Sequence, residues 1–155
     1  MTPAAITTGL TDCEWPARLE WLERPGGGRL LIDAAHNPAG AVALADYLDE
    51  SGVGPLPIVI AVMQDKDLAG IIGALAPAAA FFVATSVPLA RARPADALAA
   101  DIARLAPARR VRVEPSPDAA VELALSRHDR AVAAGSILMV GPLRECLLAA
   151  GARRV

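Results

Sequence analysis

The stretch LLIDAAHNP at residues 30–38 decides the fold, because it combines a buried strand, a polar loop and a helix start. Its apolar residues follow a glycine cluster and end at Asp33, which is typical of a strand covered on both faces. Asn37 can cap the free N–H groups of a helix, and Pro38 suits the first helical position. We therefore expect Asp33 and His36 beside a helix N-terminus at the carboxyl edge of a sheet, where α/β proteins bind ligands, particularly anions.

The same two residues also have a purely structural interpretation. Asp33 and His36 could do no more than tie down their loop through hydrogen bonds from side chain to backbone. Taken alone, the residues give the structural and the functional interpretation about equal weight.

The rest of the chain alternates apolar runs with helical patterns, which predicts a three-layer α/β domain of about six mostly parallel strands and about five helices. The first strand is expected at a sheet edge and antiparallel to the second, since a short glycine turn joins them. In the first helix, Val42, Ala45 and Leu48 have helical spacing. The expected strands cover residues 18–23, 29–33, 57–62, 80–85, 110–114 and 136–140, and the expected helices cover 38–50, 68–75, 94–106, 117–134 and a short segment from Pro142.

Composition indicates one soluble domain. The chain has 155 residues, a formal charge of −2 and a pI near 5.6, so there is no basic footprint for nucleic acid. No apolar run approaches the roughly 20 residues of a membrane span. Cys13 and Cys146 lie at opposite ends and signal neither a zinc site nor a disulfide framework. We expect a cytoplasmic protein with a linker-like segment at 1–14 and a domain at 15–155.

Lys66 is the only lysine of the chain, and it stands between two aspartates. A phosphate-binding P-loop needs Gly-Lys-Ser or Gly-Lys-Thr, so the sequence contains no P-loop. The plain interpretation of Lys66 is a solvated ammonium paired with its neighbours, contributing at most about 1 kcal/mol. The functional interpretation is a point charge at the ligand-binding edge of the sheet.

Several motifs resemble one family. The segment from Asp33 to Pro38 is similar to the Asp-x-Ala-His-Asn-Pro signature of the C-terminal domain of folylpolyglutamate synthase/dihydrofolate synthase, in the Mur ligase superfamily. The Trp-Pro-Ala-Arg segment at 15–18 resembles that family's Trp-Pro-Gly-Arg, with Ala17 where glycine is usual. Further similarity lies in the Asp-Lys-Asp loop at 65–67, the Arg-Ala pair at 91–92 and the Gly-Ser segment at 135–141.

The resemblance implies a Rossmann-like domain of an ATP-dependent ligase that adds L-glutamate to folate or dihydropteroate through an acyl phosphate. Members of the family are longer than this chain. Their N-terminal ATPase domain carries the P-loop, the Mg²⁺ ligands and the pterin site. We therefore expect that domain as a partner, in cis or in trans. The isolated chain is expected to bind and orient its ligands without turnover.

The resemblance also assigns roles to individual residues, with no catalytic residue and no metal ligand in this chain. Arg18 is expected to point toward the phosphates of ATP and Asp33 toward the nucleotide. The expected ATP-binding residues are Arg18, Asp33, His36 and Asn37, and the expected glutamate-binding residues are Lys66 and Ser136.

Two other functions remain open at this point. A stand-alone nucleotide- or anion-binding module with a regulatory role would keep the fold without the ligase reaction. Another Mur-type ligase, acting on a peptidoglycan precursor, is disfavoured by the combination of the Trp-Pro and Asp-x-Ala-His-Asn-Pro motifs. His128 is expected on a polar helix face as inert surface.

Overall fold

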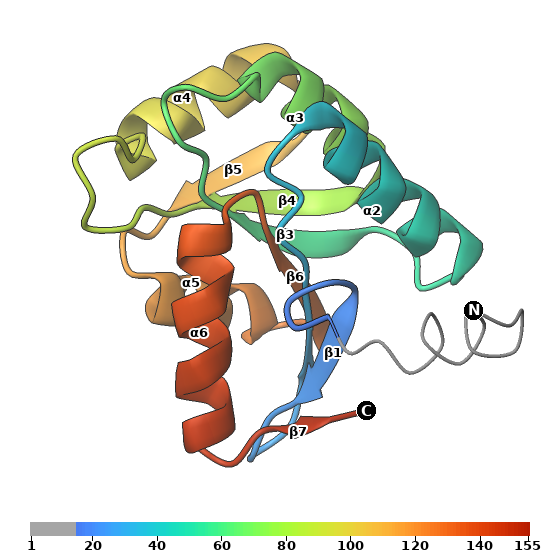
Figure 1. Cartoon of the computed structure of the whole chain (residues 1–155). Coiled ribbons are helices and arrows are strands. Elements are labelled where there is room, and N and C mark those ends of the chain that lie inside the picture. The colour runs from blue at the N-terminus through green and yellow to red at the C-terminus, as the bar shows by residue number, and fades with distance from the viewer. Residues whose placement is uncertain (1–14) are drawn as a thin grey trace, which may run out of the picture.

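The computed structural model of the chain describes residues 15–155, so the predicted linker at 1–14 lies outside the described residues. Its centre is a seven-stranded sheet of order β5-β4-β3-β6-β2-β1-β7 (Figure 1). The strands from β5 to β2 are parallel, whereas β1 is antiparallel to both of its neighbours. The strands are β1 Glu20–Glu23, β2 Arg29–Ile32, β3 Leu56–Ile60, β4 Ala79–Ala84, β5 Arg110–Val113, β6 Arg130–Ala134 and β7 Arg153–Arg154.

Helices cover both faces of the sheet and complete the predicted three-layer α/β fold (Figure 1). One face packs against α2, α3 and α4 and the other against α5 and α6, and each face has its own apolar cluster. The helices are α2 Pro38–Glu50, α3 Leu68–Leu75, the short 3₁₀ helix η1 Ala76–Ala78, α4 Ala95–Leu105, α5 Pro117–Leu125 and α6 Ile137–Ala149.

The buried stripe of α2 differs from the predicted one. The helix begins and ends as expected, but its buried residues are Ala41, Leu44 and Leu48, while Val42 is 48% exposed. A stripe starting at Ala41 and one starting at Val42 both reach Leu48, so helical spacing alone does not separate them. The small Ala41 takes the inward position at the start of the helix.

The C-terminal third corrects three predicted elements. The helix expected to reach residue 134 ends at Leu125, a strand occupies 130–134, and residues 136–140 begin α6 rather than forming a strand. Three alanines make β6 look helical by propensity, yet they suit a strand confined between β2 and β3 and covered by helices on both faces. Pro142 lies inside α6 and does not open a new helix.

The predicted sheet edge at β1 is also wrong. The two-residue strand β7 pairs outside it, with Leu22 opposite Arg154 and Glu23 opposite Arg153. A strand this short leaves no periodic signal in the sequence. The outer edges of the sheet are therefore β5 and β7.

Gly135 joins three loops at the carboxyl edge. Its φ is +99°, and a Cβ there would lie 2.5 Å from the carbonyl oxygen of Ala61, directly after β3. Its N–H also donates to the carbonyl of Ala34, after β2, at 2.9 Å. The loops after β2, β3 and β6 are thus held together at a residue where only glycine fits.

We expect Gly135→Ala to destabilise the domain by at least about 2 kcal/mol, since it adds backbone strain and a steric clash. The matched control is Gly141→Ala, in α6, where a Cβ would meet nothing within 4 Å. That change is expected to stabilise the domain by up to about 1 kcal/mol. Urea unfolding of the three proteins measures both effects, and equal midpoints would contradict the proposed close approach.

Candidate functional site at the carboxyl edge of the sheet

The candidate site lies where neighbouring strands send the chain in opposite directions. β2 and β6 are adjacent, yet α2 follows β2 onto one face and α6 follows β6 onto the other. Such a switch point opens a crevice outside the carboxyl ends of the strands, which is the usual ligand position in open α/β sheets. Asp33 and Ser136 follow these two strands, so both predicted residues stand at this crevice.

Asp33 fastens two segments of backbone together. It is 6% exposed. Its Oδ1 accepts a hydrogen bond from the N–H of Ala35 at 2.8 Å and its Oδ2 one from the N–H of Leu19 at 2.9 Å. The N–H of Ala34 completes the junction by donating to the carbonyl of Ala17 at 3.1 Å. The hydrogen bonds expected of the structural interpretation are therefore present: Asp33 holds the backbone after Arg18, and Ala34 holds the backbone before it.

The fastened segments contain strained backbone. Ala17, Leu19 and Ala35 have φ of 58°, 46° and 33°, the positive-φ non-glycine residues of the described chain. Left-handed backbone costs such residues roughly 1–2 kcal/mol each. Strain of this kind persists only where surrounding contacts impose it, and it concentrates at functional sites. Ala17 stands at the glycine position of the Trp-Pro-Gly-Arg motif that residues 15–18 resemble, and its positive φ is one that glycine would adopt without strain.

Arg18 projects from this fixed backbone into solvent. Its guanidinium carbon lies 5.4 Å from the ring centroid of Trp15, at cation–π distance, and Trp15 is itself 69% exposed. A cavity of about 370 Å³ separates the segment from the first turns of α6. It is lined by Trp15, Pro16, Ala17, Arg18, Ala34, Ile137, Val140, Gly141, Arg144 and Glu145.

Glu20 also helps to hold the backbone next to Arg18 in place. Its buried carboxylate pairs with Arg144 of α6 at 2.7 Å and with Arg154 of β7 at 2.9 Å, and it accepts the N–H of Ala17 at 2.9 Å. Burial alone would raise the pKa of Glu20, but the hydrogen bonds from Arg144 and Ala17 and the nearby positive charges outweigh it and lower the pKa. The carboxylate is thus ionised and joins β1, β7 and α6 to the Arg18 segment.

Glu20 and Arg144 are the residues that sequence reasoning missed. One signal existed for Glu20, because the alternation predicted for residues 18–23 puts it on the same strand face as the buried Leu22. A carboxylate on a buried face requires a cation. Arg144 is 124 positions away in the chain, and nothing in the sequence identifies it as that partner.

His36 and Asn37 lie in the loop that opens α2. Asn37 accepts a hydrogen bond from the N–H of Gly40 at 2.8 Å, which confirms the predicted helix cap. His36 is half-buried directly after the Asp33 turn. The loop therefore holds its shape through Asp33 and Asn37 and carries the imidazole of His36 at the crevice.

Lys66 lies on the far side of β6 from Arg18 but on the same edge. Its ammonium contacts the Asp65 carboxylate at 3.1 Å, and this hydrogen bond lowers the pKa of Asp65. The first turn of α3, which follows this loop, packs closely on the start of α2, because a Cβ on Gly70 would lie 2.6 Å from the Pro38 ring. The plain pairing expected for Lys66 is present, and Lys66 lies at the carboxyl edge of the sheet.

Ser136 begins α6 and is 2% exposed, yet its side chain makes no capping hydrogen bond. The first N–H groups of a helix have no acceptor within the helix, so they favour a carboxylate or phosphate. The predicted residues thus come together around β6, with Arg18 and Asp33 on one side, Lys66 on the other and Ser136 between them.

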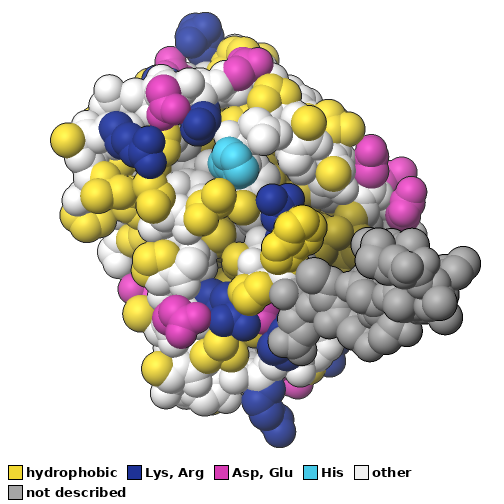
Figure 2. All heavy atoms as spheres, viewed as in Figure 1, with side chains coloured by type: hydrophobic (Ala, Val, Ile, Leu, Met, Phe, Trp, Pro, Cys, Tyr) yellow, Lys and Arg dark blue, Asp and Glu magenta, His cyan; other side chains and the backbone are white. Residues whose placement is uncertain are grey.

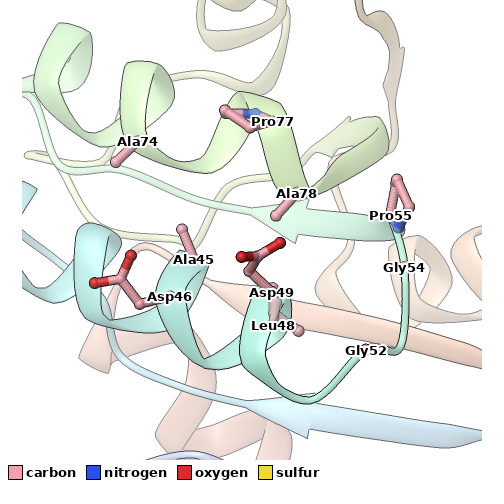
Figure 3. Close-up of a pocket in the computed structure, with 10 residues that line it drawn as sticks. All are labelled: Ala45, Asp46, Leu48, Asp49, Gly52, Gly54, Pro55, Ala74, Pro77 and Ala78. Carbon is pink, nitrogen blue, oxygen red and sulfur yellow. The ribbon is translucent and has the colours of Figure 1, made fainter.

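Another pocket, of about 540 Å³, lies at the opposite edge of the sheet between α2 and η1 (Figure 3). Its ionisable lining residues are the acidic Asp46 and Asp49, so it has no cation for a phosphate or carboxylate. Among residues 15–155 there is no cluster of three His, Cys, Asp or Glu suited to a metal, and no helix there is long and apolar enough to cross a membrane.

Comparisons with known proteins agree with the geometry. Residues 17–141 match the family described as "Mur ligase, glutamate ligase domain". The chain is 37% identical over 130 residues to the dihydrofolate synthase/folylpolyglutamate synthase of Mycobacterium tuberculosis, covering 83% of this chain and 26% of that protein. It is 35% identical over 89 residues to the folylpolyglutamate synthase of Lacticaseibacillus casei, covering 57% and 20%.

Solved structures give the same result. The M. tuberculosis folylpolyglutamate synthase complexed with ADP superposes with a TM-score of 0.82 at 31% identity, over 95% of this chain and 35% of that one. A Yersinia pestis bifunctional synthase complexed with AMPPNP and Mn ion has a TM-score of 0.80 at 24% identity, which supports the fold alone, over 96% and 35% of the two chains. This chain thus spans about a third of these two solved chains.

Glu20→Gln tests the buried carboxylate. We expect it to cost roughly 3 kcal/mol at neutral pH, because it removes the buried carboxylate that Arg144 and Arg154 share and leaves Arg144 with only the exposed Glu145 as a counter-charge. Since the folded-state pKa of Glu20 lies below the ordinary 4.5, its contribution is complete above about pH 4.5 and is lost as the pH falls through the folded value. Urea unfolding from pH 7 to 3 should show the variant and wild-type stabilities converging.

Glu23→Gln is the control for this prediction, since Glu23 lies on the same strand without a described ion pair. Its effect should stay within about 0.5 kcal/mol at every pH. A constant difference between Glu20→Gln and wild type across the pH range would refute the assigned role.

Proposed function

Because the chain belongs to the Mur ligase glutamate ligase domain family, we propose that it is the ATP- and glutamate-orienting part of a folylpolyglutamate synthase/dihydrofolate synthase. The observation that carries this proposal is the solvent-facing Arg18, fixed on both sides by Asp33 and Glu20 at the switch point of the sheet. The chain spans 26% of the M. tuberculosis relative, so the activity of the whole ligase is part of the proposal.

The proposed reaction joins a carboxylate to an amine. A folate or dihydropteroate carboxylate oxygen attacks the γ-phosphorus of ATP, giving an acyl phosphate and ADP. The amine of L-glutamate then attacks the acyl carbon, phosphate leaves with the C–O bond electrons, and the amine loses a proton. In both steps negative charge develops on phosphate oxygens, which positioned cations stabilise.

A cytoplasmic location, expected from composition, stays a prediction.

The nucleotide half of the site is assigned to the β2 side. Arg18 is placed toward the phosphates of ATP, because a guanidinium can bind two phosphate oxygens at once. Asp33 holds the backbone of Arg18 and is assigned to the nucleotide side of the crevice, with His36 and Asn37 in the adjoining loop. Fixed backbone lowers the entropy cost of placing Arg18 against a phosphate.

The glutamate half is assigned to the β3 side and to the start of α6. Glutamate brings two carboxylates and one ammonium. Lys66 supplies a cation, and the buried Ser136 with the free N–H groups of α6 supplies neutral donors. Asp65, beside Lys66, offers a negative charge for the ammonium. The two halves meet at β6, which would bring the amine toward the phosphorylated carboxylate.

The partner is proposed to be an ATPase domain, in cis or in trans, that holds the P-loop, the Mg²⁺ and the pterin. Exposed apolar side chains gather in the loops of the carboxyl edge, as expected of an interface. Figure 2 displays many apolar side chains at the surface on one face of the molecule. At the carboxyl edge they are Trp15 (69% exposed), Leu19 (38%), Leu89 (45%), Ile137 (53%) and Leu138 (37%).

A reconstituted ligase assay tests the proposal. The chain is mixed with Mg-ATP, L-glutamate and dihydropteroate or tetrahydrofolate, with and without a separately made ATPase domain of a related synthase. We expect ADP and glutamylated product only when both proteins are present. Arg18→Ala should lower kcat/KM for ATP by about 10- to 100-fold, the value of one or two hydrogen bonds to a charged group.

Arg104→Ala is the matched control, because Arg104 is exposed on α4 and pairs with Asp101. It should leave the ligase rate unchanged. Turnover by the chain alone would overturn the expected need for a second domain. No turnover in any mixture, combined with ATP binding by the chain alone, would favour the stand-alone binding module instead.

The glutamate assignment has its own test in the same assay. We expect Lys66→Ala and Ser136→Ala each to raise KM for glutamate, by about tenfold for the loss of the lysine, while KM for ATP stays near the wild-type value. Lys66→Arg keeps the charge and should retain most of the affinity. Unchanged KM for glutamate in both alanine variants would remove these residues from the glutamate site.

A further inference from the structure

A second cationic pocket lies away from the switch point. It has a volume of about 210 Å³ and sits between β5, the middle of β4 and the end of α5 with the loop that follows it. That loop enters β6 from its amino end, whereas the candidate ligase site lies beyond the carboxyl end of β6. The lining residues are Phe81, Arg110, Arg112, Leu123, Ser126, Arg127 and His128.

Strand alternation sets two of its arginines side by side. Arg110 and Arg112 are two residues apart on the edge strand β5, so they point to the same face at a spacing of about 6.6 Å. Val111, between them, packs against the apolar cluster of the opposite face. Both arginines are exposed at the side of the sheet that α5 covers.

An aromatic ring forms one wall of the pocket. The guanidinium carbon of Arg112 lies 5.5 Å from the ring centroid of Phe81, and the imidazole of His128 lies 5.6 Å from the same ring. His128 belongs to the loop after α5 and not to a polar helix face, which corrects the sequence prediction. These contacts restrain two nitrogen-bearing side chains around the pocket.

The positive charges of the pocket have no counter-charge among the described residues. Arg110, Arg112 and Arg127 form no ion pair there, and no carboxylate lines the cavity. Of the acidic side chains in neighbouring segments, Glu122 pairs with Arg24, Asp129 lies 4.0 Å from Arg130, and Glu114 accepts the N–H of Ser116 at 3.1 Å. Three guanidinium groups around one cavity repel one another, and a bound anion would relieve that repulsion.

We propose that this pocket binds a compact phosphorylated anion carrying two or more negative charges. Guanidinium groups match phosphate oxygens in paired hydrogen bonds, and the spacing of Arg110 and Arg112 suits two neighbouring phosphoryl groups. The volume is below the roughly 300–1,000 Å³ of pockets for drug-sized ligands, so the pocket accepts a diphosphate or the terminal diphosphate of a larger molecule. The proposal does not depend on the ligase reaction.

Calorimetric titration with pyrophosphate tests the pocket. All proteins carry Arg18→Ala, which removes the phosphate contact proposed for the other site. We expect one binding event, weakened about tenfold or more by Arg110→Ala or Arg112→Ala, and weakened also by Arg127→Ala. Arg112→Lys should recover only part of the loss, because lysine keeps the charge but not the planar fork.

Arg104→Ala removes one exposed positive charge elsewhere and should leave pyrophosphate affinity unchanged. Thermal unfolding of each variant checks that the exposed substitutions keep the fold. Equal affinity in all variants, or no binding to the Arg18→Ala parent, overturns the proposal. Citrate at matched ionic strength binding as tightly as pyrophosphate overturns the assignment to phosphate.

Discussion

The structure of the candidate site depends on one buried carboxylate, that of Glu20. It is the point where β1, β7, α6 and the Arg18 segment meet, through Arg144, Arg154 and the N–H of Ala17. A buried ion pair adds little net stability, because desolvation of the charges offsets most of their attraction. What it supplies here is position. A carboxylate that must satisfy two guanidinium groups and a backbone N–H leaves its surroundings few alternative arrangements.

Asp33 performs a related function with no cation of its own. Both of its oxygens accept backbone N–H groups, and the residues so held include Leu19 and Ala35, whose φ angles are positive. The strained backbone of the Arg18 segment is thus imposed by two acidic side chains, one in β1 and one directly after β2. The structural and the functional interpretation of Asp33 are therefore compatible. By fixing the loop, Asp33 determines where the guanidinium of Arg18 can reach.

Sequence patterns predicted the parts of the fold that local physics determines. Asn37 with Pro38 predicts a helix start by a capping side chain, and the structure has that cap. The helices expected at 68–75 and from residue 117 also begin where predicted, and there Asp67 and Ser116 are the caps. Prediction failed where tertiary packing overrides propensity. Alanines 131, 133 and 134 are helix formers, yet they form the strand that fits between β2 and β3. The ion pair of Glu20 with Arg144 was not predicted for a different reason, because the two residues are 124 positions apart in the sequence.

The same strand explains why the candidate residues converge. β6 is inserted between β2 and β3, so one strand separates the loops that carry Asp33 and Lys66. Directly after β6, Gly135 contacts both loops. Its N–H donates to the carbonyl of Ala34 in the loop after β2, and because it has no Cβ, the carbonyl of Ala61 after β3 can approach it closely. Gly135, which has no side chain, therefore helps to hold together the loops that carry Asp33 and Lys66. The two arginines of the second pocket depend on no such contact, because alternation along the edge strand β5 already places Arg110 beside Arg112.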